Sequence, residues 1–426
     1  MTTYTRSETP LIRRRLPWPK RVDIALLCFF ALVIALCDRV NISVAAPVIL
    51  EKNHWDTVQM GWVLSGFFIG YTLFMIPIGM LVDRFGPKRV FAWSVAWWSL
   101  FTALTPIPRT LLGMVLMRVI MGAGESGMLP SVNGILVRWF PNHEYSRATA
   151  FTWSGGYAGA IIAFPLASTL MSLWGWRAIF FAFAFLGGIW LPLWLVSSSD
   201  SPEGSRKGRS QEINMSEARP LTETAGRVPW IKILRLPALW AMLSLHFSSN
   251  WFSYILISWL PTYLMSERHF SLANMAIGSS LPFISVLFGT NLFGVLIDRF
   301  SIARDRTRVQ KFFLLPYAAA ACIFVLVPYT SASSTTVVLL CLSMALMGAA
   351  QPIYATSSLL LAPRYAGSVV AVQNTAANFA GILVPVVTGY LAKTVGWHAA
   401  FWLTAAISGG GILMYLVFGK AKKLVE

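Results

Sequence analysis

Long runs of apolar residues alternate with short polar segments along almost the whole chain. A helix that crosses a bilayer needs about 20 mainly apolar residues, and twelve runs approach or exceed that length. They lie at about 22–47, 58–82, 89–107, 110–138, 147–171, 177–197, 236–265, 271–298, 311–330, 334–361, 367–392 and 397–419. The pattern therefore predicts an all-α membrane protein with twelve transmembrane helices.

One long polar segment divides these runs into six and six. Residues 198–235 are rich in Ser, Gly, Glu, Arg and Pro, which is the composition of a linker. We expect one six-helix bundle at 22–197 and another at 236–419, with short tails at 1–21 and 420–426. The first run is longer than the apolar core of a signal peptide and has no A-x-A cleavage site, so we interpret it as a transmembrane helix.

Composition and charge support the membrane assignment. Hydrophobic residues make up 56% of the 426 residues and charged residues 12%, which excludes a soluble enzyme and a disordered chain. With the N-terminus inside, 27 of the 34 Lys and Arg residues fall on the cytoplasmic side. Both termini are therefore predicted to be cytoplasmic, in a bacterial inner membrane. This topology explains the net charge of +17 without a nucleic-acid partner.

The two halves of the sequence resemble each other. The segment GMLVDRF at 79–85 recurs as GVLIDRF at 294–300, an offset of 215, and GWRAIF at 175–180 recurs as GWHAAF at 396–401, an offset of 221. Similar offsets at equivalent places indicate a duplicated six-helix unit. Two such halves related by an axis along the membrane normal form a known transporter architecture.

Four charged residues lie deep within the predicted spans: Asp38, Arg39, Arg118 and Glu125. Charges inside a membrane cost on the order of 2.5–3.5 kcal/mol each, so they usually serve a function. Arg118 and Glu125 are about 10.5 Å apart along one helix face, so each is expected to meet a partner from the first span or a ligand. Glycines flank Glu125 and permit close approach. Glu125 is our first candidate for a proton carrier and Asp38 the second; a static ion network that fixes helix packing is the alternative.

Several neutral polar residues are weaker candidates for the lining of a cavity. His246, Asn250 and Tyr254 are spaced at i, i+4 and i+8 and therefore share one helix face. Further hydrogen-bonding groups in the second half are Gln351, Tyr354, Asn374 and Asn378. Each of these residues also has a structural interpretation, which is that it satisfies a contact between helices.

Two motifs carry a family resemblance. The stretch at 79–89 follows the pattern G-x-x-x-D-R-x-G-x-(K/R)-(K/R), and the string DRVNISVAAP occupies 38–47. With twelve spans and a basic linker, the first pattern resembles the major facilitator superfamily. The string, together with Arg118 and Glu125, is similar to the anion:cation symporter branch, many of whose members are coupled to protons.

The resemblance implies roles for particular residues. It assigns Arg39 to the carboxylate of the substrate, a suitable role for a planar guanidinium that stays protonated, and it places Tyr71 in the cavity. Arg118 would be a gating or charge-compensating partner. A conformational latch is implied at the ends of the second and eighth spans, with exposed ion pairs as the alternative and with Ser301 replacing a glycine in the second copy. The latch residues are Asp83, Arg84, Asp298 and Arg299.

The sequence also departs from the sugar-acid members of the branch. Leu36 stands in place of a tyrosine, Gly156 replaces the glutamine before Tyr157, His246 replaces another glutamine, and Ala355 stands near the position of a tryptophan. The charged positions are kept and several polyol-binding positions are not. This favours a less hydroxylated or aromatic carboxylate.

We therefore predict a monomeric secondary active transporter that imports an organic carboxylate with protons by alternating access, without a metal or cofactor. An organic-anion exporter or exchanger is the first alternative, and a non-transporting membrane sensor or intramembrane enzyme is the second. The sequence has no metal-ligand cluster, no Ser/His pair within a span and no phosphate-binding G-x-x-x-x-G-K-(S/T) loop. We therefore do not expect an enzyme. A single central group of charges suits alternating access better than a channel.

Overall fold

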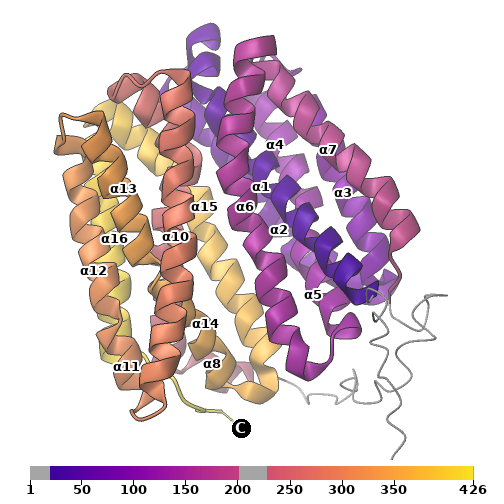
Figure 1. The fold of residues 1–426 in the computed structure, drawn as a ribbon, viewed down its shortest axis with the longest axis vertical. Helices are drawn as coiled ribbons and strands as arrows, with labels where there is room; N and C mark the ends of the chain where they lie inside the picture. The colour runs from indigo at the N-terminus through magenta and orange to yellow at the C-terminus, as the bar shows by residue number, and fades with distance from the viewer. Residues whose placement is uncertain (1–19, 201–227, 426) are drawn as a thin grey trace, which may run out of the picture.

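The computed structural model describes residues 20–200 and 228–425, and these residues form helices and no strands (Figure 1). The predicted tail before residue 20, the centre of the predicted linker at 201–227, and residue 426 lie outside the described residues. Within the second part of the predicted linker, a five-residue helix, α8 (Trp230–Leu234), precedes the seventh long segment.

Twelve long helical segments follow one another along the described chain. The first six are α1 (Lys20–Asn53), α2 (Thr57–Phe85), α3 (Pro87–Leu104), α4 with α5 (Leu111–Glu125 and Met128–Trp139), α6 (Asn142–Trp174) and α7 (Trp176–Ser197). The second six are α9 with the π-helical turn η2 (Pro237–Thr262 and Tyr263–Glu267), α10 (Leu272–Ser301), α11 with α12 and η3 (Arg306–Phe312, Leu314–Leu326 and Val327–Tyr329), α13 with α14 (Ser333–Met347 and Ala350–Leu361), α15 (Ala366–Thr394, after the short turn η4, Pro363–Tyr365) and α16 (Trp397–Phe418). The predicted architecture of twelve transmembrane helices is thereby confirmed.

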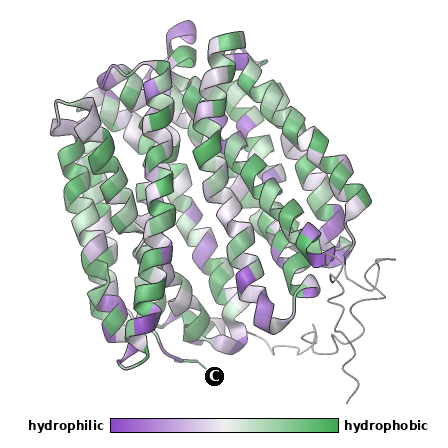
Figure 2. Ribbon diagram, viewed as in Figure 1, coloured by the Kyte–Doolittle hydropathy of each residue, from purple (hydrophilic) through white to green (hydrophobic). Residues whose placement is uncertain are grey.

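The segments pack as two bundles, seen in Figure 1 as the indigo-to-magenta half and the orange-to-yellow half. We call them the N-bundle (α1–α7) and the C-bundle (α9–α16). Helix α1 packs on α6 and α2 on α4 within the first, as α9 packs on α16 and α10 on α13 within the second. The bundles meet where α2 packs on α15, α6 on α10 and α1 on α9. In Figure 2 hydrophobic residues make up most of the length of the helices, and hydrophilic residues are more frequent toward the helix ends, as expected for helices that cross a membrane.

Nine of the helical segments in the described chain are long and apolar enough to cross a membrane on length and hydropathy alone. The other three are α1, α3 and α9. Helix α3 is 18 residues long and carries Lys88 and Arg89 in its first turn, and α9 contains polar residues including His246 and Asn250. These three helices pack within the same two bundles as the rest, so they are part of the same membrane-spanning fold.

Two predicted spans are interrupted in their middle at equivalent places. Helix α4 ends at Glu125 and α5 begins at Met128, while α13 ends at Met347 and α14 begins at Ala350. The cause is a proline near the start of each second helix, Pro130 and Pro352, because proline has no N–H for the helix hydrogen bond. The sequence analysis missed both interruptions, which lie at the level of the central cavity.

The repeated GW motifs mark equivalent helix connections. Gly175 separates α6 from α7 with φ of 81°, and Gly396 separates α15 from α16 with φ of 109°. These positive φ angles favour glycine, because a Cβ atom is strained in that region. The internal repeat in the sequence is therefore a repeat of backbone conformation as well.

The two ends of the molecule differ in how the bundles meet. We call the end where α1 begins and α16 ends the terminal end, which is at the bottom of Figure 1, and the opposite end the distal end. At the distal end, Thr57 Oγ1 donates to the Gly389 carbonyl at 2.6 Å, and Lys393 Nζ lies 2.8 Å from Asp56 Oδ2. Nearer the centre, Ser65 Oγ donates to the Ile382 carbonyl at 2.6 Å. These contacts join α2 to α15, and α6 diverges from α10 toward the terminal end (Figure 1).

Candidate functional site

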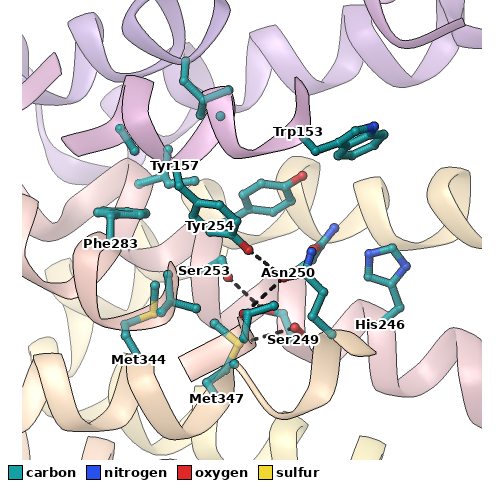
Figure 3. A pocket seen from close by; sticks show the side chains of 18 of the residues that line it. Trp153, Tyr157, His246, Ser249, Asn250, Ser253, Tyr254, Phe283, Met344 and Met347 are labelled. Carbon is teal, nitrogen blue, oxygen red and sulfur yellow. Dashed lines mark hydrogen bonds between the residues drawn. The ribbon is translucent and has the colours of Figure 1, made fainter. Parts of the chain in front are cut away.

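A cavity of about 260 Å³ lies between the two bundles, close to the centre of the molecule (Figure 3). The N-bundle contributes lining residues from α1, α2, α5 and α6, and the C-bundle contributes residues from α9, α10, α13, α14 and α15. Because both bundles supply walls, a ligand in the cavity would contact each of them. A movement of one bundle against the other would therefore change the shape of this cavity.

Arg39 is the charged residue that lines this cavity, and Glu125 holds it. Arg39 Nη2 lies 2.6 Å from Glu125 Oε1, and Arg39 Nε donates to the same oxygen at 2.7 Å. The Arg39 side chain is 12% exposed and that of Glu125 is fully buried. The ion pair joins the first and fourth spans, as expected from their predicted charges.

Aromatic rings and close helix packing position the Arg39 guanidinium. Its central carbon lies 5.0 Å from the centre of the Phe67 ring and 4.9 Å from that of Tyr71. Both rings belong to α2, which packs tightly on α4, because a Cβ atom on Gly122 would lie 2.0 Å from the Phe67 carbonyl oxygen. Gly122, about one turn before Glu125, thus serves helix packing, and the rings provide a cation–π contact for the guanidinium.

Asp38 and Arg118 form a second charged group behind the cavity. Arg118 Nη1 contacts the backbone carbonyl of Asp38 at 3.3 Å and the Met121 sulfur at 3.2 Å. Both Asp38 carboxylate oxygens are buried without a hydrogen bond among the described residues, and Trp98 and Thr102 of α3 lie beside them. Arg118 is buried and does not line the cavity. Unlike Arg39, it is therefore not placed to contact a ligand there.

The neutral polar candidates line the cavity from the C-bundle. His246, Asn250 and Tyr254 face it from α9, and Asn374 and Asn378 from α15. Tyr254 Oη donates to Asn378 Oδ1 at 2.9 Å, and Asn378 Nδ2 donates to the Asn374 carbonyl at 2.8 Å. Tyr71 faces the same cavity from the N-bundle. The structure therefore gathers all of these predicted residues around one space.

His246 has a distinct environment within this group. Its ring stacks on the ring of Tyr354 from α14, with 3.9 Å between centroids and 13° between planes. Its Nδ1 atom is buried without a hydrogen-bond partner in the described part of the chain. Stacking fixes the ring, which leaves an unpaired polar atom beside the cavity.

Several lining residues were not among the candidates from the sequence. Tyr157 Oη donates across the bundles to Gln351 Oε1 at 2.6 Å, and Thr290 Oγ1 donates to the same oxygen at 3.3 Å. Trp153, Ser249, Ser253, Phe283, Met344 and Met347 also line the space (Figure 3). Their sequence signal is weak, because an apolar or Ser residue that faces a cavity has the same character as one that faces a neighbouring helix.

The predicted latch residues lie far from this cavity at the terminal end. Asp83, Arg84 and Arg299 are exposed, and the Arg84 guanidinium lies 5.2 Å from the centre of the Phe85 ring. Asp298 pairs with Arg306 of its own bundle, and Asp83 has no hydrogen bond or ion pair to any described residue of the C-bundle. The two copies of the motif therefore differ in their partners.

No three His, Cys, Asp or Glu side chains come together as a possible metal site in residues 20–200 and 228–425. The chemical resources of the cavity are one guanidinium, one buried carboxyl group bonded to it, and neutral polar and apolar walls. Such a site can bind an anion through the guanidinium and can exchange a proton at the carboxyl group.

Comparisons with known proteins place this arrangement in a family. Residues 28–385 match the Major Facilitator Superfamily. Sodium-dependent phosphate transport protein 1, chloroplastic, from Arabidopsis thaliana is 32% identical and aligns over 96% of this chain and 82% of its own length. A probable sulfoacetate transporter, SauU, from Cupriavidus necator is 30% identical over 93% of each chain. The chain belongs to the major facilitator superfamily and, within it, to the anion:cation symporter branch.

Solved structures show the same fold at low sequence identity. A bacterial homolog of the human lysosomal transporter Spinster, in an inward-facing and unoccupied conformation, aligns with a TM-score of 0.79 at 18% identity, over 94% of this chain and 97% of its own. The D-xylose-proton symporter aligns with a TM-score of 0.73 at 15% identity, over 95% and 99%. The protein is a multi-pass membrane transporter of anions and not an enzyme.

Proposed function

We propose that this protein imports an organic carboxylate together with protons, using Arg39 to bind the carboxylate and Glu125 to carry a proton. The observation that carries the proposal is the bond between the two side chains at the cavity wall. Glu125 occupies the same guanidinium that a substrate carboxylate would use. The substrate and the ionised Glu125 therefore compete for one positive charge.

This competition supplies the coupling. When Glu125 takes up a proton it loses its charge, and Arg39 becomes free to form a bidentate pair with the substrate carboxylate. When the substrate leaves, an unpaired guanidinium in an apolar site is costly, and Glu125 releases its proton to pair with Arg39 again. Each transport cycle thus carries one proton on Glu125 together with one anionic group on Arg39.

Asp38 is the second proposed proton site. An ionised carboxylate needs hydrogen bonds when it is buried, and Asp38 has none among the described residues. We infer that Asp38 is protonated in the conformation described here and that Arg118 becomes its partner when the proton leaves. Movement of the Arg118 side chain from the Asp38 backbone carbonyl to its carboxylate would accomplish this change without entry of the ligand.

The arrangement of the bundles fits one state of alternating access. If the excess of basic residues marks the cytoplasmic side, the terminal end faces the cytoplasm, both termini are cytoplasmic, and the distal contacts close the outer side. The structure is then the inward-facing state of an inner-membrane importer. In the outward-facing state, the exposed Asp83 would contact the C-bundle and act as a latch, with Arg84, Asp298 and Arg299 beside it.

The names of the relatives leave the class of anion open. They include transporters named for phosphate, ascorbate and sulfoacetate, and a guanidinium binds carboxylate, phosphate and sulfonate oxygens alike. Carboxylate is proposed because the cavity has a single accessible cation, which matches a single negative charge. Phosphate as the better ligand would revise the substrate and retain the site.

The decisive experiment is uptake into proteoliposomes with an imposed pH gradient. An inward proton gradient should accelerate the accumulation of a labelled carboxylate, and a protonophore should abolish the acceleration. Equal uptake with and without the gradient would overturn symport and favour an exchanger. An exchanger would then be recognised because uptake would require the same anion inside the proteoliposomes.

A further inference from the structure

One wall of the cavity, contributed by the C-bundle, is apolar. Phe283 and Val286 of α10 and Met344 and Met347 of α13 form it, and all four are buried. We call these residues the methionine wall. Figure 3 shows Phe283 and Met344 at one end of the cavity and His246 and Trp153 at the other. A ligand held at Arg39 that fills the cavity must place part of its surface against this wall.

The polar groups near the methionine wall are already bonded to one another. Tyr157 and Thr290 donate to Gln351 Oε1, Tyr254 donates to Asn378, and Ser249 Oγ lies 3.4 Å from the Met347 sulfur. The donors of these groups are therefore engaged, and a ligand hydroxyl group that meets the apolar side chains of this wall is buried without a partner, which costs about 1–3 kcal/mol. The methionine wall therefore disfavours ligands whose hydroxyl groups face it.

The methionine wall combines a fixed ring with adaptable side chains. Phe283 stacks on Phe164 of α6, with 5.7 Å between ring centroids and 28° between planes. Met344 and Met347 have flexible, polarisable side chains that adjust to irregular apolar shapes. Aromatic and branched aliphatic groups would both find complementary contacts there.

We propose that the substrates of this transporter are monocarboxylates whose remaining part is apolar, aromatic or alicyclic, and that the methionine wall selects them. The inference rests on the proposed binding of a carboxylate by Arg39 and adds the class of the remaining part. The cavity of about 260 Å³ has room for a ligand with one such ring. Arg39 is the one cation among the described lining residues, which favours a ligand with a single negative charge.

A matched pair of ligands tests this selection. Cyclohexanecarboxylate and quinate share a ring and a carboxylate, but quinate carries several hydroxyl groups on the ring. We expect cyclohexanecarboxylate to bind the purified transporter at least about tenfold more tightly, measured by ligand-induced thermal shift and by competition in counterflow. Cyclohexylmethanol, which has the ring without the charge, should not bind.

Variants of the methionine wall provide the second part of the test. Met344→Gln and Met347→Gln keep the length of the side chain and add polarity, and each should reduce the preference for cyclohexanecarboxylate severalfold. Met344→Leu should keep the preference, because it keeps the apolar surface. Met80→Gln is the matched control, since Met80 is exposed on α2 outside the cavity, and it should leave the ratio unchanged.

The outcomes separate this inference from the function on which it rests. Binding of quinate as tightly as cyclohexanecarboxylate, or Gln variants that melt normally and keep the full preference, would overturn the selection by the methionine wall alone. If neither acid nor any other carboxylate binds, the assignment of Arg39 to a carboxylate is wrong and the inference falls with it.

Discussion

The two halves of the central cavity differ in charge although they come from one duplicated unit. The four charged residues deep in the described spans all belong to the N-bundle, on α1 and α4. The C-bundle half presents neutral polar groups and the methionine wall. In the proposed function, the two walls have different tasks: the N-bundle supplies the groups for the anion and the proton, and the C-bundle surrounds the remaining part of the ligand.

A comparison of α4 with α13 shows that a few substitutions at equivalent positions account for this difference in charge between the bundles. Pro130 and Pro352 interrupt the two spans in the same way and are 222 residues apart, close to the offset between the GW motifs. At that same offset Met347 takes the place of Glu125, and Leu340 takes the place of Arg118. The position that holds a carboxyl group in one bundle therefore holds part of the apolar wall in the other.

A change in the shape of the Arg39 side chain, in the N-bundle half, should have the largest effect on ligand affinity. Arg39→Lys keeps a positive charge but loses the planar fork that bonds two carboxylate oxygens. Disruption of one partner of a buried, hydrogen-bonded charge pair costs about 2–5 kcal/mol, so we expect ligand affinity to fall about 30-fold or more. Arg147→Lys, on the exposed surface of α6, is the matched control. Unchanged affinity in Arg39→Lys would show that the carboxylate binds elsewhere.

Neutralisation of Glu125 should separate binding from coupling. Glu125→Gln keeps the size of the side chain and can no longer take up a proton, so proton-driven accumulation should be lost while counterflow exchange continues. Both activities are measured in the same proteoliposomes. The matched control is Glu51→Gln at the exposed end of α1. Full accumulation by the Glu125 variant would assign the coupling proton to another group.

These differences between the halves were only partly predictable from the sequence. Charged residues within spans are rare, so Asp38, Arg39, Arg118 and Glu125 could be found by inspection, and the glycines around Glu125 pointed to close packing. The methionine wall gave no such signal, because an apolar side chain is expected everywhere in a transmembrane helix. Contacts across the bundles, such as that between Tyr157 and Gln351, depend on how two bundles dock, which helix periodicity does not specify.

The interruptions of the fourth and tenth spans, in contrast, have a clear signal in the sequence that the sequence analysis did not use. Each span contains a glycine followed within four residues by a proline, Gly127 with Pro130 and Gly348 with Pro352. That pattern disfavours a continuous helix, yet the apolar runs at 110–138 and 334–361 suggested single helices. Hydropathy identifies a span, but the break inside it has to be read from the individual residues.

Removal of the ion pair that joins the two bundles at the distal end should have a moderate effect on the population of the open state. Asp56→Asn keeps the helix cap on α2, because asparagine is also a good cap, and removes the charge that pairs with Lys393. Exposed pairs contribute about 0.2–1 kcal/mol, so the population open at the distal end should rise by up to about fivefold. Lys393→Gln should do the same. Spin labels at Lys52→Cys and Thr394→Cys, in a chain without the native cysteines, would measure the opening.

The pH dependence of this contact has a defined sign. The hydrogen bond from Lys393 holds the pKa of the Asp56 carboxyl group below its ordinary value. A lowered pKa means that the contact contributes above the ordinary range of roughly pH 4 and is lost only as the pH falls below it. The distances should therefore be the same at pH 8 and pH 5 in a chain with Gln at position 125. A change in that range in this background would contradict the assignment.

Substitution of His246, at the polar end of the C-bundle half, should have the smallest effect on ligand affinity. His246→Phe keeps a ring that can stack on Tyr354 and removes the unpaired Nδ1 atom. If the C-bundle binds the remaining part of the ligand mainly through apolar contact, the affinity for cyclohexanecarboxylate should change by less than about threefold, since no hydrogen bond of about 1 kcal/mol is lost. His246→Ala, which also removes the stacking ring, should weaken binding more than His246→Phe. A loss in the phenylalanine variant as large as that in Arg39→Lys would show that the C-bundle, too, binds the ligand through a polar anchor, and the contrast between the two halves would have to be abandoned.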